Sequence, residues 1–318
     1  MEPVAPVTVK LRDWSLLLLC NFIWASQFAL VKLVQDEVGP LFTTAFPMLL
    51  ATCLLMPVVV WSRRARPTTH RARIRGVDAA AFLTIGILGQ VVAQLFATWG
   101  TQRSLASNAA LLSLSLPVAT ALMAFVLLGE RMTRVRWIGF ALAIAGVIVS
   151  SSNDFRGADL RGRGFLLGNT MVFLGVLGSA FYNVYSKKLL ARYTPLEVLL
   201  GSYVTACLLL VPVALVAEPE GVSRLAILST RGWVGLLLLA VFQYCVSMII
   251  FLTVLTRLDA TQAAVSNYLI PAFGVVVAWL LLGEQLHSSA IVGGVLVLAS
   301  TLLVTVWEER MNARRLSP

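Results

Sequence analysis

Ten apolar runs, each about 20 residues long, follow one another along the 318-residue chain. A membrane-spanning helix needs about 20 mainly apolar residues to cross a hydrocarbon core about 30 Å thick. The runs lack the strict alternation of a barrel strand, and helices are the other structure that satisfies its own backbone in lipid. The sequence therefore predicts an all-α integral membrane protein with ten transmembrane helices. The predicted spans are 14–34, 39–61, 79–101, 105–128, 134–152, 164–187, 195–217, 232–256, 260–283 and 288–307.

Charge is scarce and scattered, which excludes several classes of soluble protein. Charged residues make up 13% of the chain and hydrophobic residues 58%, whereas soluble domains carry about 25% charged residues. The net charge of +10 does not indicate nucleic-acid binding, because no soluble domain concentrates it. We therefore expect the lipid bilayer as the main partner and no nucleic acid.

The distribution of lysine and arginine predicts the orientation. If the N-terminus is cytoplasmic, 18 of the 25 basic residues fall in inside segments and 7 in outside segments, as the positive-inside rule requires. The first apolar run is also too long for a usual signal-peptide core. We expect a multi-pass protein of the cell inner (plasma) membrane with both termini cytoplasmic.

The second half of the sequence repeats the first. The tetrapeptide LLGE ends at Glu130 and again at Glu284, 154 residues later, and Pro117 matches Pro271 at the same offset. Each half holds five predicted spans, 14–152 and 164–307. Because five is odd, the second copy must enter the membrane from the opposite side. The pattern predicts two inverted five-helix repeats, the plan of many secondary transporters, with a substrate site between them.

The repeated LLGE is interpreted as a structural corner rather than as a functional motif. Gly129 and Gly283 suit the end of a helix, where positive φ is often needed. Glu130 and Glu284 would then lie at the entrance of the next helix, whose N-terminal dipole favours negative charge. A proton-coupling role for these carboxylates is the alternative, and their interfacial position argues against it.

Several segments resemble a known family: WASQFALVK in the first span, PVATALMAFVLLGE and IPAFGVVVAWLLLGE before the short loops, and RWIGFALAIAGVIV. They look like the EamA-type branch of the drug/metabolite transporter superfamily, over nearly the whole chain. The resemblance implies a metabolite carrier, often an exporter of amino acids in a bacterial inner membrane. It also implies a cavity lined by the first, third, fourth, sixth, eighth and ninth spans.

All fifteen acidic residues fall in loops or at span ends, so the predicted membrane interior contains neutral polar and aromatic groups only. Strongly cationic substrates are disfavoured without a buried carboxylate. Alternatively, these side chains bond helices to one another. The candidate substrate-binding residues are Asn21, Trp24, Gln27, Gln90, Gln94, Ser113, Tyr182, Asn183, Gln243, Tyr244, Asn267 and Tyr268.

Two prolines, Pro117 and Pro271, lie near the middle of their predicted spans. A proline inside a helix removes one backbone bond and frees the carbonyl four residues earlier, here that of Ser113 or Asn267. We expect kinks or hinges at both sites, and the freed carbonyls are candidate acceptors for a ligand.

The four cysteines lie singly in apolar runs and the two histidines have no obvious partners, so no metal or cofactor is expected. No acid, base or nucleophile cluster suggests an enzyme. The leading interpretation is a secondary-type transporter, expected to export small neutral or zwitterionic metabolites, including aromatic amino acids, by alternating access. Export of hydrophobic drugs and a non-transporting membrane scaffold are the alternatives. The sequence indicates no oligomeric state.

Overall fold

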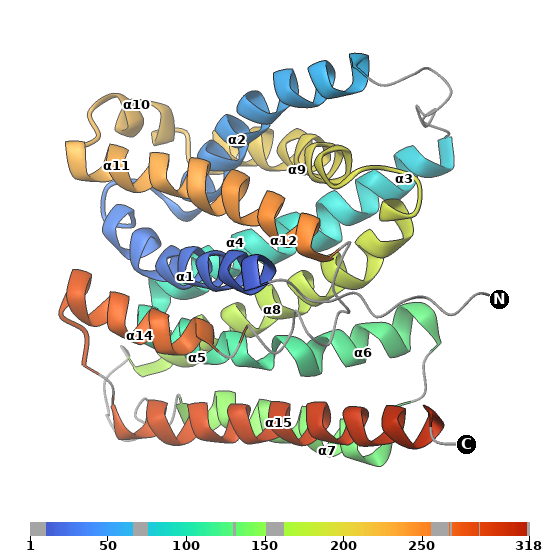
Figure 1. Ribbon diagram of the computed structural model, residues 1–318. Helices are drawn as coiled ribbons and strands as arrows, with labels where there is room; N and C mark the ends of the chain where they lie inside the picture. Colours follow the sequence, from blue (N-terminus) through green and yellow to red (C-terminus); the bar gives the residue numbers. More distant parts are fainter. Residues whose placement is uncertain are drawn as a thin grey trace.

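The computed structural model describes residues 11–65, 76–129, 132–150, 162–255, 267, 269–285 and 287–316. These residues are almost all helical, and no strand occurs among them (Figure 1). Seven described helices are long and apolar enough to cross a membrane, and Leu269–Leu282 and Ser288–Val304 are shorter apolar helices. The predicted all-α membrane fold is confirmed, while the count of ten spans stays a prediction.

The helices follow the predicted apolar runs closely. The first half contains α1 (Leu11–Val34), α2 (Pro40–Arg64), α3 (Gly76–Thr84), the π-helical η2 (Ile85–Val91), α4 (Val92–Arg103), α5 (Ala106–Leu112), the 3-10 turn η3 (Ser113–Ser115), α6 (Leu116–Leu128) and α7 (Arg134–Ser150). The second half contains α8 (Gly162–Leu190), α9 (Pro195–Ala217), α10 (Gly221–Ala226), α11 (Thr230–Leu238), the π-helical η5 (Leu239–Val246), α12 (Ser247–Leu255), α14 (Leu269–Leu282) and α15 (Ser288–Leu316).

Helix packing follows the repeat. Helices α7 and α15 form the lowest layer of Figure 1, and α1, α4 and α8 cross the middle. By the repeat, α8 corresponds to α1 and α14 to α6. The contact of α1 with α14 therefore has its counterpart in the contact of α8 with α6, and both are present. The equivalent helices α2 and α9 pack on each other, as do α7 and α15. The two-repeat architecture thus fits the described helices.

Both halves carry a π-helical segment at the same place. The segment Ile85–Val91 in the third span and the segment Leu239–Val246 in the eighth start 154 residues apart, the offset of the repeated LLGE. Such widened turns occur mostly as local insertions in α-helices, often at functional sites. Gln90 lies in the first and Gln243 in the second.

Helices α7 and α15 touch backbone to backbone where glycines meet. A Cβ added to Gly293 would lie 2.5 Å from the carbonyl oxygen of Gly146 and 2.6 Å from Cβ of Ser150. A Cβ on Gly139, the counterpart of Gly293, would meet Cγ2 of Val304, the counterpart of Ser150, and would lie 3.4 Å from the carbonyl oxygen of Ser300. Small residues let membrane helices approach this closely, so this contact joins the two repeats symmetrically.

Helices α2 and α9 are tied together at both ends. The carboxylate of Glu218, just after α9, accepts hydrogen bonds from the N–H groups of Leu41 and Phe42, both at 3.1 Å, at the start of α2. At the other end, Nε of Arg63 in the last turn of α2 lies 2.7 Å from the carboxylate of Glu197 in the first turn of α9. A negative group at a helix N-terminus stabilises the helix, so these contacts hold the pair as a unit.

Two glycines with positive φ follow the ends of α6 and α14. Gly129, with φ of 68°, follows the last residue of α6, and Gly283, with φ of 66°, follows α14. No other described residue has a positive φ. Glycine adopts this left-handed conformation without the Cβ clash of other residues, so the helices end at these positions.

Glu284 lies between α14 and α15, as expected, but its carboxylate contacts a different helix. Oε1 of Glu284 accepts a hydrogen bond from the N–H of Ala106 at 3.0 Å. Its Oε2 accepts hydrogen bonds from the N–H and the hydroxyl of Ser107 at 3.0 and 2.9 Å. Glu284 therefore caps α5, in the other half, and not the next helix in sequence. The reason is packing, because α14 lies against α5. Glu130 lies outside the described residues.

Replacing Glu284 with alanine is expected to lower the free energy of unfolding by about 2 kcal/mol, because two helix N–H groups and a hydroxyl lose their acceptor. Thermal unfolding of the purified protein in one detergent measures the change. Glu220→Ala is the matched control, since Glu220 is exposed and pairs only with Arg224 four residues on among described residues. Equal melting temperatures for the two variants would contradict the capping role.

Candidate functional site

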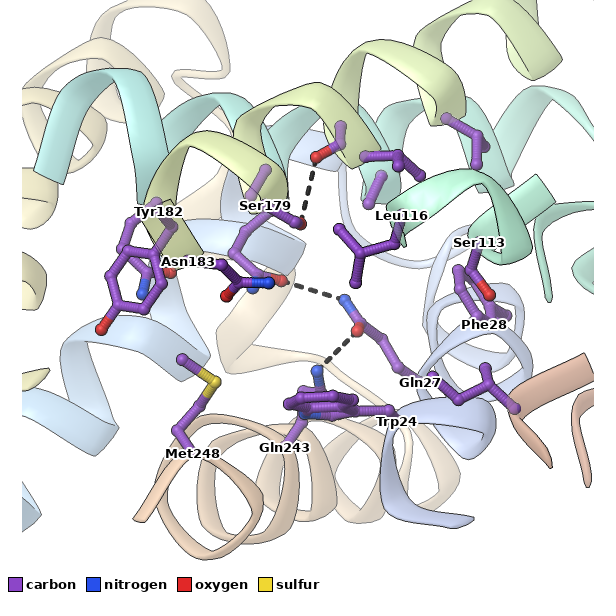
Figure 2. Close-up of a pocket in the computed structure, with 18 of the residues that line it drawn as sticks. Trp24, Gln27, Phe28, Ser113, Leu116, Ser179, Tyr182, Asn183, Gln243 and Met248 are labelled. Atoms are coloured by element: carbon purple, nitrogen blue, oxygen red, sulfur yellow. Dashed lines mark hydrogen bonds between the residues drawn. The ribbon is translucent and has the colours of Figure 1, made fainter. Parts of the chain in front are cut away.

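A cavity of about 120 Å³ lies between the two halves. It is lined from the first, third, fourth, sixth, eighth and ninth spans, the set that the family resemblance implied. Eight of the twelve candidate residues line it: Trp24, Gln27, Gln90, Gln94, Ser113, Tyr182, Asn183 and Gln243. Figure 2 shows most of these side chains around one space.

Repeat-related positions face each other across this cavity. Six pairs of lining residues are related by an offset of 154 or 155. The cavity is therefore lined by equivalent positions of the two repeats. The pairs are Trp24 and Ser179, Gln27 and Tyr182, Phe28 and Asn183, Gln94 and Met248, Ala97 and Phe251, and Leu116 and Ile270. The positions are symmetric but the chemistry is not, because several polar residues face apolar counterparts.

Three glutamine side chains form a continuous hydrogen-bonded chain. Nε2 of Gln243 donates to Oε1 of Gln27 at 2.6 Å, and Nε2 of Gln27 donates to Oε1 of Gln94 at 3.1 Å (Figure 2). The chain connects η5, α1 and α4. Because Gln243 belongs to the second half and the other two to the first, the chain also joins the two repeats.

The rings of Trp24 and Phe251 form an aromatic wall beside the glutamine chain. The indole N–H of Trp24 donates to Oγ of Ser247 at 3.0 Å, and Ser247 donates to the carbonyl oxygen of Gln243 at 2.6 Å. The ring of Trp24 packs on Phe251 with centroids 4.9 Å apart. Trp24 is thus held in a fixed orientation, with Met248 on the same side of the cavity in Figure 2.

Helix α8 approaches α4 closely enough to bring its own polar residues to the cavity. A Cβ on Gly175 would lie 2.8 Å from the backbone nitrogen of Ala97 and 2.9 Å from the carbonyl oxygen of Ala93. Only glycine permits this approach. Ser179 and Asn183, one and two turns further along α8, line the cavity as a result.

Comparison with known proteins now identifies the family. Residues 14–152 and 166–306 both match the EamA-like transporter family. The chain belongs to this family. Together with the long apolar helices, membership makes this EamA protein a multi-pass membrane transporter of small molecules. The family is one of transporters, which supports the prediction that the chain is not an enzyme.

Named relatives cover nearly the full length of this EamA transporter. A protein of Streptantibioticus cattleyicolor named "Probable terminal-alkyne amino-acid exporter" is 30% identical over 92% of each chain. A Salmonella typhimurium protein named "Probable amino-acid metabolite efflux pump" is 28% identical, over 95% of this chain and 97% of its own. An uncharacterized transporter of Archaeoglobus fulgidus is 28% identical, over 91% and 96%. A solved crystal structure aligns with a TM-score of 0.62 at 16% identity, over 94% of this chain and 99% of its own, which shows a shared fold.

The other four candidates do not line the cavity of this EamA transporter. Asn21 is buried away from the lining, and so is Asn267. Tyr244 packs edge-on against Tyr203, with centroids 5.9 Å apart, and its carbonyl oxygen accepts from the hydroxyl of Tyr203. Tyr244 thus belongs to the core, because it points away from the face on which its neighbour Gln243 lies. Tyr268 lies outside the described residues.

Pro117 stands at a break in the helix, and Pro271 is the third residue of α14. The 3-10 turn η3 precedes Pro117, which lies in the first turn of α6. The carbonyl of Ser113 accepts the N–H of Leu116, and the carbonyl of Asn267 accepts that of Ile270 at 3.1 Å. A proline leaves each of these carbonyls without its usual donor, but each accepts a hydrogen bond from the N–H group three residues later. Neither carbonyl therefore needs a ligand as its hydrogen-bond partner. A hinge role stays a prediction.

Sequence reasoning missed several lining residues of the EamA cavity. Ser179 is the repeat counterpart of Trp24, so the offset of 155 applied to the first span would have found it. Met248 and Phe251 lie one and two turns after Gln243 and carry no polar signal. Apolar lining residues cannot be told from core residues by composition, because both are buried and hydrophobic.

The cavity contains no acidic, basic or histidine side chain among its lining residues. Within the described part of the chain, no three His, Cys, Asp or Glu side chains are placed to hold a metal ion. All four cysteines are free. The groups available to a solute are therefore amides, hydroxyls and aromatic faces.

Proposed function

We propose that this EamA transporter exports small neutral or zwitterionic metabolites, including amino acids and aromatic ones among them, by alternating access. The observation that supports this most is the lining, which combines amide groups with an aromatic wall and has no ionic side chain. The names of two relatives, an amino-acid exporter and an amino-acid metabolite efflux pump, agree with it.

The absence of ionic side chains from the lining argues against substrates of net charge. An unpaired charge taken from water into an apolar site loses its hydration without compensation. A zwitterion carries its counter-charge with it, and amides can bond both of its groups. The aromatic pair Trp24 and Phe251 supplies a surface for an apolar or aromatic side chain.

Export of hydrophobic drugs is the second candidate, and the same aromatic wall favours it. An apolar drug would leave the partly exposed Asn183 amide and the nitrogen of Gln94 without hydrogen-bond partners, which costs about 1–3 kcal/mol for each group. Zwitterions are therefore the better match to the whole lining.

We further propose the cell inner membrane as the location, with both termini cytoplasmic and the five-helix repeats spanning 14–152 and 164–307. In Figure 1, α1 starts and α15 ends at the right-hand end of each helix, which agrees with an even number of crossings. The excess of basic residues in the predicted inside segments supports that orientation.

Counterflow in proteoliposomes tests the transport proposal. Vesicles with the full chain are loaded with one unlabelled compound and exposed to its labelled form, over amino acids, neutral metabolites and hydrophobic drugs. We expect accumulation of at least one amino acid above protein-free vesicles, with saturation. Accumulation of drugs alone would favour the second candidate, and no amino-acid counterflow would contradict the proposal.

A further inference from the structure

The hydrogen bonds of the glutamine chain all run in one direction, from Gln243 through Gln27 to Gln94. This direction is fixed by which atoms of each amide donate and which accept. Each carboxamide has one oxygen that accepts and one nitrogen that donates. The oxygen of Gln27 accepts from Gln243, and the nitrogen of Gln27 donates to Gln94. A single reversed amide would place oxygen against oxygen or nitrogen against nitrogen. The three side chains can therefore reverse only together.

The two ends of the chain differ in their access to the cavity. At the Gln243 end the oxygen is fully buried, and that side chain is only 4% exposed. At the other end, Gln94 is partly exposed and lines the cavity, with its oxygen engaged by Gln27. No described residue accepts a hydrogen bond from Nε2 of Gln94. The enclosed end is an acceptor and the open end is a donor.

We propose that the chain orients the substrate by its carboxylate. Gln94 donates to the carboxylate oxygens as a specificity-determining residue, and Gln27 acts as the positioning residue that keeps the nitrogen of Gln94 towards the cavity. This assignment rests on the proposed export of zwitterions and adds the group that is recognised. A freely rotating amide would accept an ammonium or an amide as readily as it binds a carboxylate, whereas a held one discriminates.

The test compares L-phenylalanine with L-phenylalaninamide, which differ at the carboxyl group and therefore also in net charge, zero for the acid and positive for the amide. The Gln27→Leu variant adds no charge to the protein, so it separates the orientation of Gln94 from this charge difference. The full chain in detergent is titrated with each compound, and the concentration that gives half the maximal rise in melting temperature is recorded. The wild-type protein is expected to bind the acid about tenfold more tightly than the amide, since a hydrogen bond to a charged group is worth about 1.5 kcal/mol or more.

Two variants are expected to change the preference between the two ligands. Gln94→Glu keeps an oxygen for Gln27 but replaces the donor with a carboxylate oxygen, so the preference should reverse in favour of the amide. Gln27→Leu releases Gln94, which can then present either end, so the ratio should fall towards one. A purely structural role for Gln27 would lower stability and leave this ratio unchanged.

Gln102→Glu is the matched control, because it makes the same substitution on α4 outside the cavity lining and should keep the wild-type ratio. An unchanged acid-to-amide ratio in folded Gln94→Glu would overturn the assignment. So would a wild-type protein that prefers the amide. L-Phenylalanine counterflow measured in parallel separates the two proposals: no amino-acid flux contradicts the export proposal, while flux with an unaltered ratio contradicts the carboxylate assignment alone.

Discussion

Replacement of Gly175 by valine is expected to abolish transport and to lower the melting temperature of the protein. A Cβ at this position would lie 2.8 Å from the nitrogen of Ala97 and 2.9 Å from the oxygen of Ala93, both backbone atoms of α4. Backbone atoms inside a helix cannot move aside, so α8 and α4 must separate. Overpacking of this kind costs about 1–3 kcal/mol, and it also moves Gln94 away from the other lining residues.

The initial rate of counterflow and the melting temperature measure the two effects. Gly76→Val is the matched control, because a Cβ on Gly76 would meet nothing within 4 Å. We expect this control to keep most of the transport rate. Equal losses in the two variants would mean that the contact between α4 and α8 does not shape the cavity.

Trp24→Ala is expected to raise the KM for an aromatic amino acid by about tenfold or more, since a large apolar face and a held aromatic partner are both lost. Its indole donates to Ser247 and stacks at a tilt on Phe251. Trp24→Phe keeps the aromatic face but loses the hydrogen bond, so its effect should be smaller. Counterflow at varied substrate concentration gives KM for each variant.

The control for this substitution is Trp279→Ala. Trp279 is 61% exposed on α14, outside the lining. Its loss should leave KM close to the wild-type value. If Trp279→Ala raises KM as much as Trp24→Ala does, the assignment of Trp24 as a substrate-contacting residue is wrong.

Much of the fold could be predicted because its signals are local. Apolar runs of the length of the bilayer gave the helices, and the glycine of each LLGE gave a helix end with positive φ. The π-helical segments could not be predicted in this way, because no single residue type marks a widened turn. Their repetition at an offset of 154 became visible only in the backbone.

The site was predicted in part, and the errors have a common cause. Polar residues in apolar spans were good candidates, and eight of twelve line the cavity. Tyr244 shows the limit, because helical phase decides whether a residue faces the cavity or the core, and a π-helical segment shifts that phase. The corner glutamate shows the same limit, since its helix partner lies 177 residues away in sequence.

Three properties could be read from the amino-acid sequence alone: the chain spans a bilayer, its second half repeats the first, and the predicted membrane interior contains amides and aromatic rings without ionic groups. These properties depend on composition and periodicity, which are read along the chain. The three-dimensional packing was needed to show which amides bond to one another, which glycines allow two helices to touch, and which helix Glu284 caps. Those contacts join residues from different spans, and their geometry depends on how the helices pack in three dimensions.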